Sequence, residues 1–257
     1  MGVPGRLDIR NVSKSFDVDG RRLDVLSHVS FDVAPGAFVS IVGPSGCGKS
    51  TLLRLILGVD GDYHGDILLN GERISKPALS RGVVFQDHRL LPWLTLQQNV
   101  ALSLENSGWS QAEKTKAVAD NIALVGLQGF EQAFPHQLSG GMAQRGAIAR
   151  GLANRPDILL LDEPLGALDA LTRLRLQGEL QRIWRAEGVT MILVTHDVDE
   201  AIFLSDEVIV MNAKPGRVAE RVTVELEGER DRGSAAFAAH KKRVLDAMGD
   251  YVRAQAA

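Results

Sequence analysis

Residues 43–50 read GPSGCGKS and match the pattern G-x-x-x-x-G-K-[ST]. An apolar run at 38–42 comes directly before this segment, and residues 51–57 after it have the apolar spacing of a helix. Glycines in such a turn let backbone N–H groups face phosphate oxygens, and the first turn of a helix adds unpaired N–H groups and the positive end of its dipole. Lys49 would place its ammonium on the β- and γ-phosphates, and the Ser50 hydroxyl would bind Mg²⁺. The segment predicts a phosphate-binding loop.

A pair of carboxylates follows a second apolar run. Residues 158–161 are Ile-Leu-Leu-Leu, and Asp162 and Glu163 come directly after them. Ligands of open α/β sheets bind at the carboxyl ends of the strands, so both side chains are expected near a ligand. Asp162 could hold the magnesium shell, and Glu163 could orient or deprotonate an attacking water. The alternative for these residues alone is an acidic strand end that caps the next helix.

Short apolar runs alternate with amphipathic stretches, which favours an α/β fold with helices on a largely parallel sheet. Residues 66–74 predict a hairpin around the tight turn Asn70-Gly71. Other strands are expected at 29–33, 38–42, 83–85, 158–161, 190–194 and 208–210. Helices are expected at 51–57, 95–104, 112–125, from 139 onward and at 170–185. The run of helices between about 86 and 154 indicates a helical insert inside an α/β core.

The composition excludes several classes of protein. The chain has 257 residues, 45% hydrophobic and 24% charged, which is typical of a globular protein with a sizeable core. Lysines and arginines number 29 against 32 acidic residues, so the net charge of −3 leaves no basic excess for nucleic-acid binding. A single cysteine, Cys47, excludes an intramolecular disulfide. No run of 18 apolar residues is present, so we expect no transmembrane segment.

A third motif, LSGGM at residues 138–142, resembles the signature sequence of the ATPases of ABC transporters, which other P-loop enzymes lack. The other motifs of that family follow in order. Gln86 ends a strand as the Q-loop glutamine does, Asp169 lies in a segment similar to the D-loop, and His196 resembles the switch histidine. Phe16, upstream of the phosphate-binding loop, resembles the aromatic residue that stacks on adenine. The resemblance covers about residues 6–220.

The resemblance implies a fold and a domain organisation. The fold is expected to be a P-loop NTPase of the ABC cassette type: a RecA-like core sheet, an antiparallel β subdomain and an inserted helical subdomain. A single ATPase domain is expected over residues 1–225, with 1–86 and 155–225 forming the α/β core and β subdomain and 87–154 the helical insert. Residues 226–257 are expected to form a short, helical C-terminal tail.

The resemblance also implies ATP and Mg²⁺ as ligands, with roles assigned by motif. The residues expected to bind ATP are Phe16, Gly43, Pro44, Ser45, Gly46, Cys47, Gly48, Lys49, Ser50 and Thr51. Catalytic roles fall to Glu163, His196 and Gln86, metal contacts to Ser50, Gln86 and Asp162, and the D-loop position to Asp169. Two chains of this family sandwich ATP head to tail. The residues facing the partner's ATP would be Ser139, Gly140, Gly141 and Met142.

Each of these residues also has a simpler interpretation. Phe16 could belong to the core, and Ser139 and Asp169 could cap helices. Cys47 is interpreted as a small filler residue. The alternative is a thiol that an alkylating reagent can reach and that bound MgATP would shield. The apolar segment 90–94 is expected to receive a permease helix, and the alternative is packing inside the helical insert.

The signature departs from the family pattern at its last position, where Met142 replaces the usual glutamine. Methionine lacks the hydrogen-bonding amide, but the serine and glycines that meet phosphate are intact, so we do not interpret this as inactivation.

Two longer stretches resemble one branch of the family. Residues 85–95 (FQDHRLLPWLT) and 162–173 (DEPLGALDALTR) are similar to the ATPases of nitrate, sulfonate and taurine importers, most of all to the aliphatic sulfonate branch. This implies a peripheral subunit at the cytoplasmic face of the inner membrane, paired with a second copy and with permease subunits. It also implies a periplasmic or extracellular substrate-binding protein as an indirect partner, and no nucleic acid. An ATPase of an exporter or of another importer class is the alternative.

Overall fold

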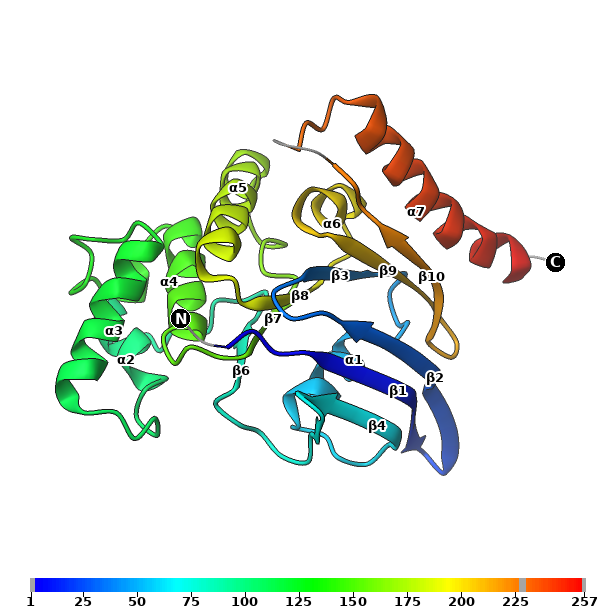
Figure 1. Ribbon diagram of the computed structural model, residues 1–257, viewed down its shortest axis with the longest axis horizontal. Coiled ribbons are helices and arrows are strands. Elements are labelled where there is room, and N and C mark those ends of the chain that lie inside the picture. Colours follow the sequence, from blue (N-terminus) through cyan, green and yellow to red (C-terminus); the bar gives the residue numbers. More distant parts are fainter. Residues whose placement is uncertain (1–2, 227–229, 256–257) are drawn as a thin grey trace. The chain divides into compact units, whose positions relative to one another are not determined.

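The computed structural model describes residues 3–226 and 230–255, which form two compact units. Residues 79–189, with residues 3 and 4, form one of them, here called the helix-rich unit. The other, here called the strand-rich unit, consists of residues 5–78, 190–226 and 230–255. Figure 1 labels most of the elements of both.

The strand-rich unit contains an antiparallel sheet with the strand order β2-β1-β4-β5. Its strands are β1 (Leu7–Val18), β2 (Arg21–Val33), β4 (His64–Leu69) and β5 (Glu72–Arg73). The turn between β4 and β5 has positive φ at both Asn70 (54°) and Gly71 (83°). Two positive φ values are typical of the type I′ turn, whose twist matches that of the flanking strands. The predicted hairpin is therefore confirmed.

The same unit contains parallel strands that carry the phosphate-binding loop. Strand β3 (Phe38–Val42) pairs in parallel with β8 (Thr190–Val194) and with β9 (Glu207–Asn212), while β10 (Arg217–Thr223) pairs with β9 in the antiparallel sense. Every residue of β3 and β8 is buried, as expected for strands covered on both faces. The unit's helices are α1 (Lys49–Leu57), α6 (Val198–Leu204) and α7 (Ala235–Gln255).

The helix-rich unit holds one parallel strand pair and most of the helices. Strand β6 (Arg81–Val84) pairs in parallel with β7 (Ile158–Asp162). The helices are α2 (Leu96–Leu102), α3 (Gln111–Leu124), α4 (Gly140–Leu152) and α5 (Ala170–Glu187), with a 3₁₀ turn at Pro135–Gln137. Both α2 and α3 begin with capping boxes, in which Thr95 and Ser110 exchange hydrogen bonds with the third residue of the helix.

The α/β fold predicted from the sequence is confirmed, and most predicted elements are present within a few residues. Three elements were not predicted: β1, α6 and β10. In β1 the buried and exposed residues do not alternate, because the pairing register with β2 shifts at three points between Ile9 and Ser15. Helix α6 has only seven residues, too few for a helical period to emerge. The two units divide the chain between residues 78 and 79 and between residues 189 and 190, so β6, β7 and α5 lie in the same unit as helices α2 to α4.

The C-terminal helix α7 packs into the core of the strand-rich unit. Phe237 and Val244 of α7 are 2% and 0% exposed, and they join a buried cluster that includes Val42, Ile202 and Val210. Ion pairs surround this contact: Lys241 with Asp199 of α6 and Arg243 with Glu220 of β10. The tail is therefore packed against α6 and the sheet through buried apolar side chains.

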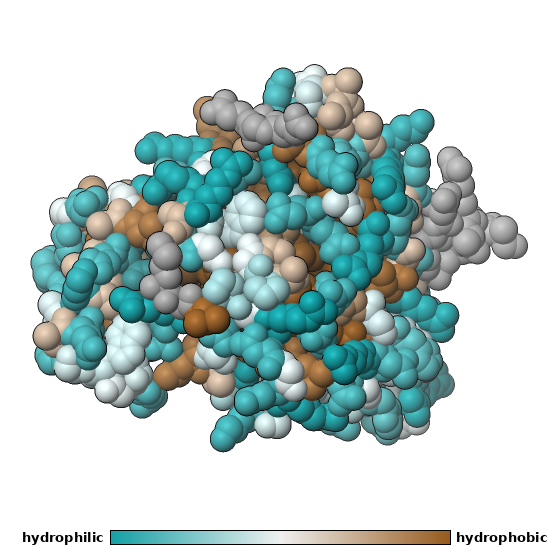
Figure 2. Space-filling view, viewed as in Figure 1, coloured by the Kyte–Doolittle hydropathy of each residue, from teal (hydrophilic) through white to brown (hydrophobic). Residues whose placement is uncertain are grey.

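None of the helices in residues 3–226 and 230–255 combines the length and the apolar character needed to cross a bilayer. On the face shown in Figure 2, polar residues cover most of the surface and apolar ones form small separate groups.

Truncating the core-facing side of α7 should destabilise the strand-rich unit. We expect Phe237→Ala to lower the free energy of unfolding by about 3 kcal/mol or more, the typical cost of deleting a buried phenyl ring. Leu245 lies on the same helix but is 46% exposed, so Leu245→Ala is the matched control and should change stability by less than about 1 kcal/mol. Urea unfolding measures both. Equal, small effects would show that α7 does not belong to the core.

Candidate functional site

The phosphate-binding loop connects β3 to α1 in the strand-rich unit. Gly48 caps the helix with φ 88°, a left-handed conformation that favours glycine. The Lys49 ammonium donates hydrogen bonds to the carbonyl oxygens of Gly43 at 2.8 Å and Pro44 at 3.3 Å, and the residue is only 8% exposed. The loop thus curls around its own lysine. Ser45, Gly46 and Ser50 stay exposed on it.

Glycine is required where the loop contacts the rest of the unit. A Cβ on Gly48 would lie 2.5 Å from Cδ2 of Leu26, and a Cβ on Gly216 would lie 2.1 Å from the Cys47 carbonyl. Both distances are far below van der Waals contact. The underside of the loop is therefore packed directly against β2 and against the turn before β10. On its open side, by contrast, a Cβ on Gly46 would meet nothing within 4 Å.

The Cys47 side chain is buried inside the phosphate-binding loop. It is 0% exposed, and its sulfur lies 2.8 Å from the position that a Cβ on Gly43 would take. Burial raises the pKa of the thiol, and the nearby Lys49 ammonium only partly offsets this effect. This burial agrees with a small filler residue, and the alternative of a thiol open to alkylation is wrong, because the loop turns this side chain inward.

Phe16 lies on β1 and is 38% exposed, which contradicts the alternative that it is a core residue. The ammonium of Lys14 lies 4.7 Å from the centroid of its ring.

His196 is in the same unit, in the short connection between β8 and α6. A buried network precedes and follows it: the Thr195 hydroxyl donates to the Glu200 carboxylate at 2.5 Å, and the backbone N–H of Asp197 donates to the Thr195 hydroxyl at 3.1 Å. Asp197 in turn caps α6 by accepting from the Glu200 N–H. Thr195 and Glu200 are 2% and 3% exposed, so this network fixes the backbone on both sides of His196.

The helix-rich unit brings Gln86 close to Glu163. Glu163 has φ 47°, unusual for a residue with a side chain, and its carbonyl accepts a hydrogen bond from the Gly166 N–H at 3.0 Å. A Cβ on Gly166 would lie 3.1 Å from Nε2 of Gln86 and 3.4 Å from the Glu163 carbonyl oxygen. Glycine at 166 therefore lets the Gln86 amide approach the turn that follows Asp162 and Glu163.

The signature segment forms the start of α4. The Ser139 hydroxyl accepts a hydrogen bond from the Met142 N–H at 3.3 Å and so caps the helix. A Cβ on Gly141 would lie 2.8 Å from Cγ2 of Thr172 on α5, so a larger residue would displace one helix. Asp169 caps α5 in the same way, and hydrogen bonds from Thr172 lower the pKa of its carboxyl. Both capping interpretations of Ser139 and Asp169 are confirmed.

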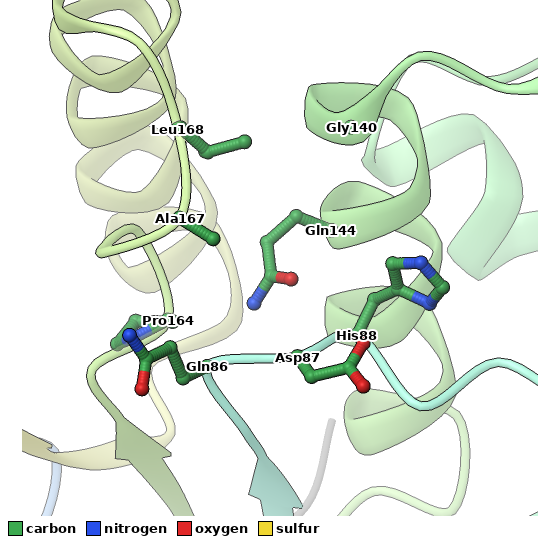
Figure 3. Close-up of a pocket in the computed structure, with 8 residues that line it drawn as sticks. All are labelled: Gln86, Asp87, His88, Gly140, Gln144, Pro164, Ala167 and Leu168. Atoms are coloured by element: carbon green, nitrogen blue, oxygen red, sulfur yellow. The ribbon is translucent and has the colours of Figure 1, made fainter.

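Figure 3 shows a pocket of about 330 Å³ within this unit. It lies between the segment after β6, the first turns of α4 and the segment before α5. Its lining residues are Gln86, Asp87, His88, Gly140, Gln144, Pro164, Ala167 and Leu168. Gln144 points into it from α4 and Leu168 from the opposite wall. The Q-loop, signature and D-loop segments thus share one cavity.

Helix α4 also holds the segment that follows Gln86. The Gln144 amide donates to the Phe85 carbonyl at 3.1 Å, and the Arg150 guanidinium donates to the carbonyls of His88 and Arg89 at 3.0 and 2.6 Å. Farther along, the buried amide of Asn99 bonds the backbone of residues 91, 94 and 95. The segment 86–95 is therefore firmly fixed at both ends.

The apolar stretch inside this segment divides into a buried and an exposed part. Leu90 is 5% exposed and belongs to the core, whereas Trp93 is 68% exposed. The alternative of packing inside the insert is correct for Leu90 and wrong for Trp93.

These residues fit a triphosphate with Mg²⁺. The loop around Lys49 is lined by backbone groups and has open space at Gly46. Within the described part of the chain, no group of three or more His, Cys, Asp or Glu could hold a metal by itself. A Mg²⁺ here would take phosphate oxygens and few protein ligands, as this ion commonly does.

Sequence reasoning missed the residues that support the motifs. Glu200 could have been found, because Asp197 and Glu200 have the D-x-x-E spacing of a helix start. Gln144 and Arg150 had no such signal, since their carbonyl partners lie 59 and 61 residues away in the sequence.

Comparisons with known proteins agree with these motifs. The sequence matches the family described as ABC transporter over residues 26–166. An uncharacterized ABC transporter ATP-binding protein of Methanocaldococcus jannaschii is 47% identical over 247 residues, 96% of this chain and 92% of that protein. The aliphatic sulfonates import ATP-binding protein SsuB of Bacillus subtilis is 47% identical over 232 residues, 90% of each chain. A solved dimeric ATP-binding cassette in a post-hydrolysis state, bound to ADP and Pi, is 31% identical with a TM-score of 0.74, over 86% of this chain and 99% of that one.

The buried thiol predicts slow alkylation. We expect iodoacetamide to modify Cys47 at least about tenfold more slowly in the native chain than in urea, because the loop must open before the reagent can reach the thiol. A free energy of opening of only about 1.4 kcal/mol already lowers the fraction of molecules with an exposed thiol tenfold. Because the pKa is raised, the native rate should still increase with pH above about 8.5, where an ordinary thiol is already half ionised. A native rate equal to the unfolded one would show that the thiol faces solvent.

Proposed function

This chain belongs to the ATP-binding proteins of ABC transporters and is an ATPase, and we propose that it powers the import of an aliphatic sulfonate through a separate membrane permease. The observation that supports an aliphatic sulfonate as the transported substrate is the similarity to SsuB proteins along nearly the whole chain. Taurine and nitrate are the next candidates, and an exporter ATPase or another importer class is the alternative function. The family itself was correctly predicted from the motifs.

We propose that Lys49 and the loop N–H groups bind the phosphates of ATP, and that Ser50, Gln86 and Asp162 hold Mg²⁺. The ion would neutralise charge on the phosphates. Glu163 is the proposed base for the attacking water. Its left-handed backbone and the close approach of Gln86 to Gly166 support a fixed carboxylate at this position.

We propose that His196 contacts the γ-phosphate and the water held by Glu163. The buried Thr195–Glu200 hydrogen bond supports this role, because it fixes the chain next to the imidazole. A histidine whose backbone is held in place can respond to the nucleotide without reordering the loop.

The functional assembly is proposed to be a head-to-tail pair of chains. Ser139, Gly140, Gly141 and Met142 would face the partner's ATP with a hydroxyl and backbone N–H groups at the start of α4. The dimeric state of the similar ADP-bound cassette supports this arrangement.

Trp93 is proposed to contact the permease at the cytoplasmic face of the membrane. Its indole is an exposed aromatic on a segment whose backbone is fixed by Arg150 and Asn99, which favours a preformed contact surface. Gln86 begins the same segment, so a change at the nucleotide would reach this surface through few residues. A periplasmic or extracellular binding protein would deliver the anion from outside.

Reconstitution tests the proposed cargo. With its permease and binding protein in liposomes, the chain should import a linear alkanesulfonate in an ATP-dependent manner and prefer it to taurine and nitrate. Radiolabelled uptake into the vesicles measures this. Uptake of nitrate or taurine alone would assign another importer class, and movement only in the opposite direction would assign an exporter.

Glu163→Gln is the control that removes the proposed catalytic base while preserving the size and shape of the side chain. We expect ATP hydrolysis and uptake to fall by roughly 10²–10⁴, the usual contribution of a general base, while ATP still binds and holds the dimer together. Lys49→Ala should instead weaken ATP binding itself, because a buried phosphate loses its cation. Hydrolysis near the wild-type rate in Glu163→Gln would exclude this residue as the base.

Trp93→Ala tests the permease contact. We expect the affinity for the permease to fall by about 2 kcal/mol or more, roughly thirtyfold, which is the scale of aromatic anchors at interfaces. Phe130 is a matched control, because it is an exposed aromatic (44%) of the same unit outside the segment. Co-purification with the permease and urea unfolding of the isolated subunit are the measurements. Normal permease binding, or loss of folding, would reject the assignment.

A further inference from the structure

Lys14 is a buried charge that none of the motifs explains. The residue is 5% exposed and lies on β1, two positions before Phe16. Its ammonium donates to the Asp60 carboxylate at 3.1 Å and to the backbone carbonyl of Asp62, and the Asp62 carboxylate lies 3.6 Å away. Burying a cation is costly unless partners surround it, so this ammonium is held in one place by the loop that contains both aspartates.

The fixed ammonium lies over an aromatic face. It is 4.7 Å from the centroid of the Phe16 ring, well within the range of a cation–π interaction. Lys14 and Phe16 lie two positions apart on β1, and their side chains meet although the register with β2 shifts between Lys14 and Ser15. Phe16 keeps 38% of its surface exposed, so the contact orders a ring that still faces solvent in part.

This contact is tied to both ends of helix α1, whose first turn belongs to the phosphate-binding loop. Asp60 lies just beyond the C-terminal end of α1, which Gly58 caps. At the other end, the cross-strand partner of Lys14 is Leu26, the residue against which Gly48 packs. These contacts all lie within the strand-rich unit. They therefore hold the Phe16 ring at a defined position relative to the phosphate-binding loop.

We propose that Lys14 is a positioning residue for the nucleotide base. Its ammonium fixes the Phe16 ring and draws π-electron density toward one face. The opposite face then becomes less negative and stacks better on the electron-rich adenine. This inference rests on the proposed contact of Phe16 with adenine. It adds the Lys14 ammonium as the group that orients and polarises the ring.

A ligand without a base separates this role from a structural one. Tripolyphosphate occupies the loop around Lys49 but cannot stack on Phe16. Loss of Lys14 should therefore weaken ATP binding and leave tripolyphosphate binding unchanged, whereas a distorted loop would weaken both.

The first experiment compares Lys14→Met with the wild-type chain by calorimetric titration of MgATP and of magnesium tripolyphosphate. We expect ATP affinity to fall roughly three- to thirtyfold, the range of a cation–π contact, and tripolyphosphate affinity to stay within about twofold. Lys14→Arg, which keeps the cation, should restore most of the ATP affinity. Unchanged ATP affinity, or equal losses for both ligands, would overturn the proposal.

Two further variants keep the proposal testable if Lys14→Met does not fold. Asp60→Asn removes the negative charge of the carboxylate that pairs with the ammonium and is 18% exposed. It should weaken the binding of ATP but not that of tripolyphosphate. Asp62→Asn is its matched control, because that side chain is 99% exposed and the backbone carbonyl contact remains; it should change neither affinity. Equal effects of the two variants on ATP would contradict the proposal.

A double-mutant cycle with Phe16→Leu links the effect to the ring. Without the ring, Lys14→Met should cause no additional loss of ATP affinity, so the two losses should be far from additive. Additive losses would overturn the role of Lys14 and leave the adenine contact of Phe16 intact. If Phe16→Leu alone leaves ATP affinity unchanged while Lys49→Ala weakens it, the adenine contact itself is wrong although the phosphate site stands.

Discussion

The phosphate-binding loop depends on close backbone approach around one buried ammonium. Lys49 is enclosed because its own loop supplies carbonyl oxygens at 2.8 and 3.3 Å. This curvature uses a left-handed conformation at Gly48, which glycine adopts at little cost. The curled loop then fits against Leu26 and Gly216 at distances that no side chain at 48 or 216 would allow. Strand β2 and the turn before β10 must therefore be in place for the loop to keep its shape. The fold positions the loop from below and leaves its upper surface to the ligand.

Backbone carbonyls accept hydrogen bonds from arginine side chains elsewhere in both units. In the strand-rich unit, Arg230 donates to the carbonyls of residues 202, 203 and 205 at the end of α6, where the negative end of the helix dipole favours a cation. In the helix-rich unit, Arg145 and Arg182 donate to carbonyls at the end of α3, and Arg150 does the same for the segment after Gln86. These contacts join segments far apart in the sequence and use atoms that every residue carries. They fix loops and helix ends without requiring a particular residue type at the position that supplies the carbonyl.

This difference explains what could be predicted from the sequence. The phosphate-binding loop, the Asn70-Gly71 hairpin and the end of α1 were predictable, because each is determined by a few adjacent residues with special backbone requirements. The inward turn of Cys47 was not, since it depends on how Gly43 and Lys49 pack around the sulfur. Lys14 and Arg150 escaped prediction for a related reason. Their partners lie 46 to 62 residues away, and no local pattern marks them.

Glu163 shows how such long-range support serves a proposed catalytic position. A left-handed backbone at a non-glycine residue costs of order 1 kcal/mol and persists only where neighbouring structure enforces it. Two contacts lie next to this turn: the Gly166 N–H donates to the Glu163 carbonyl, and the Gln86 amide comes close to Gly166. Gln86 also begins the segment held by α4, so contacts at Gly166, Gln86 and Phe85 lie between Glu163 and the helix that starts with the signature residues. Movement of α4 relative to the end of β7 would therefore change the contacts around Gln86 and Gly166 and, through them, the turn at Glu163.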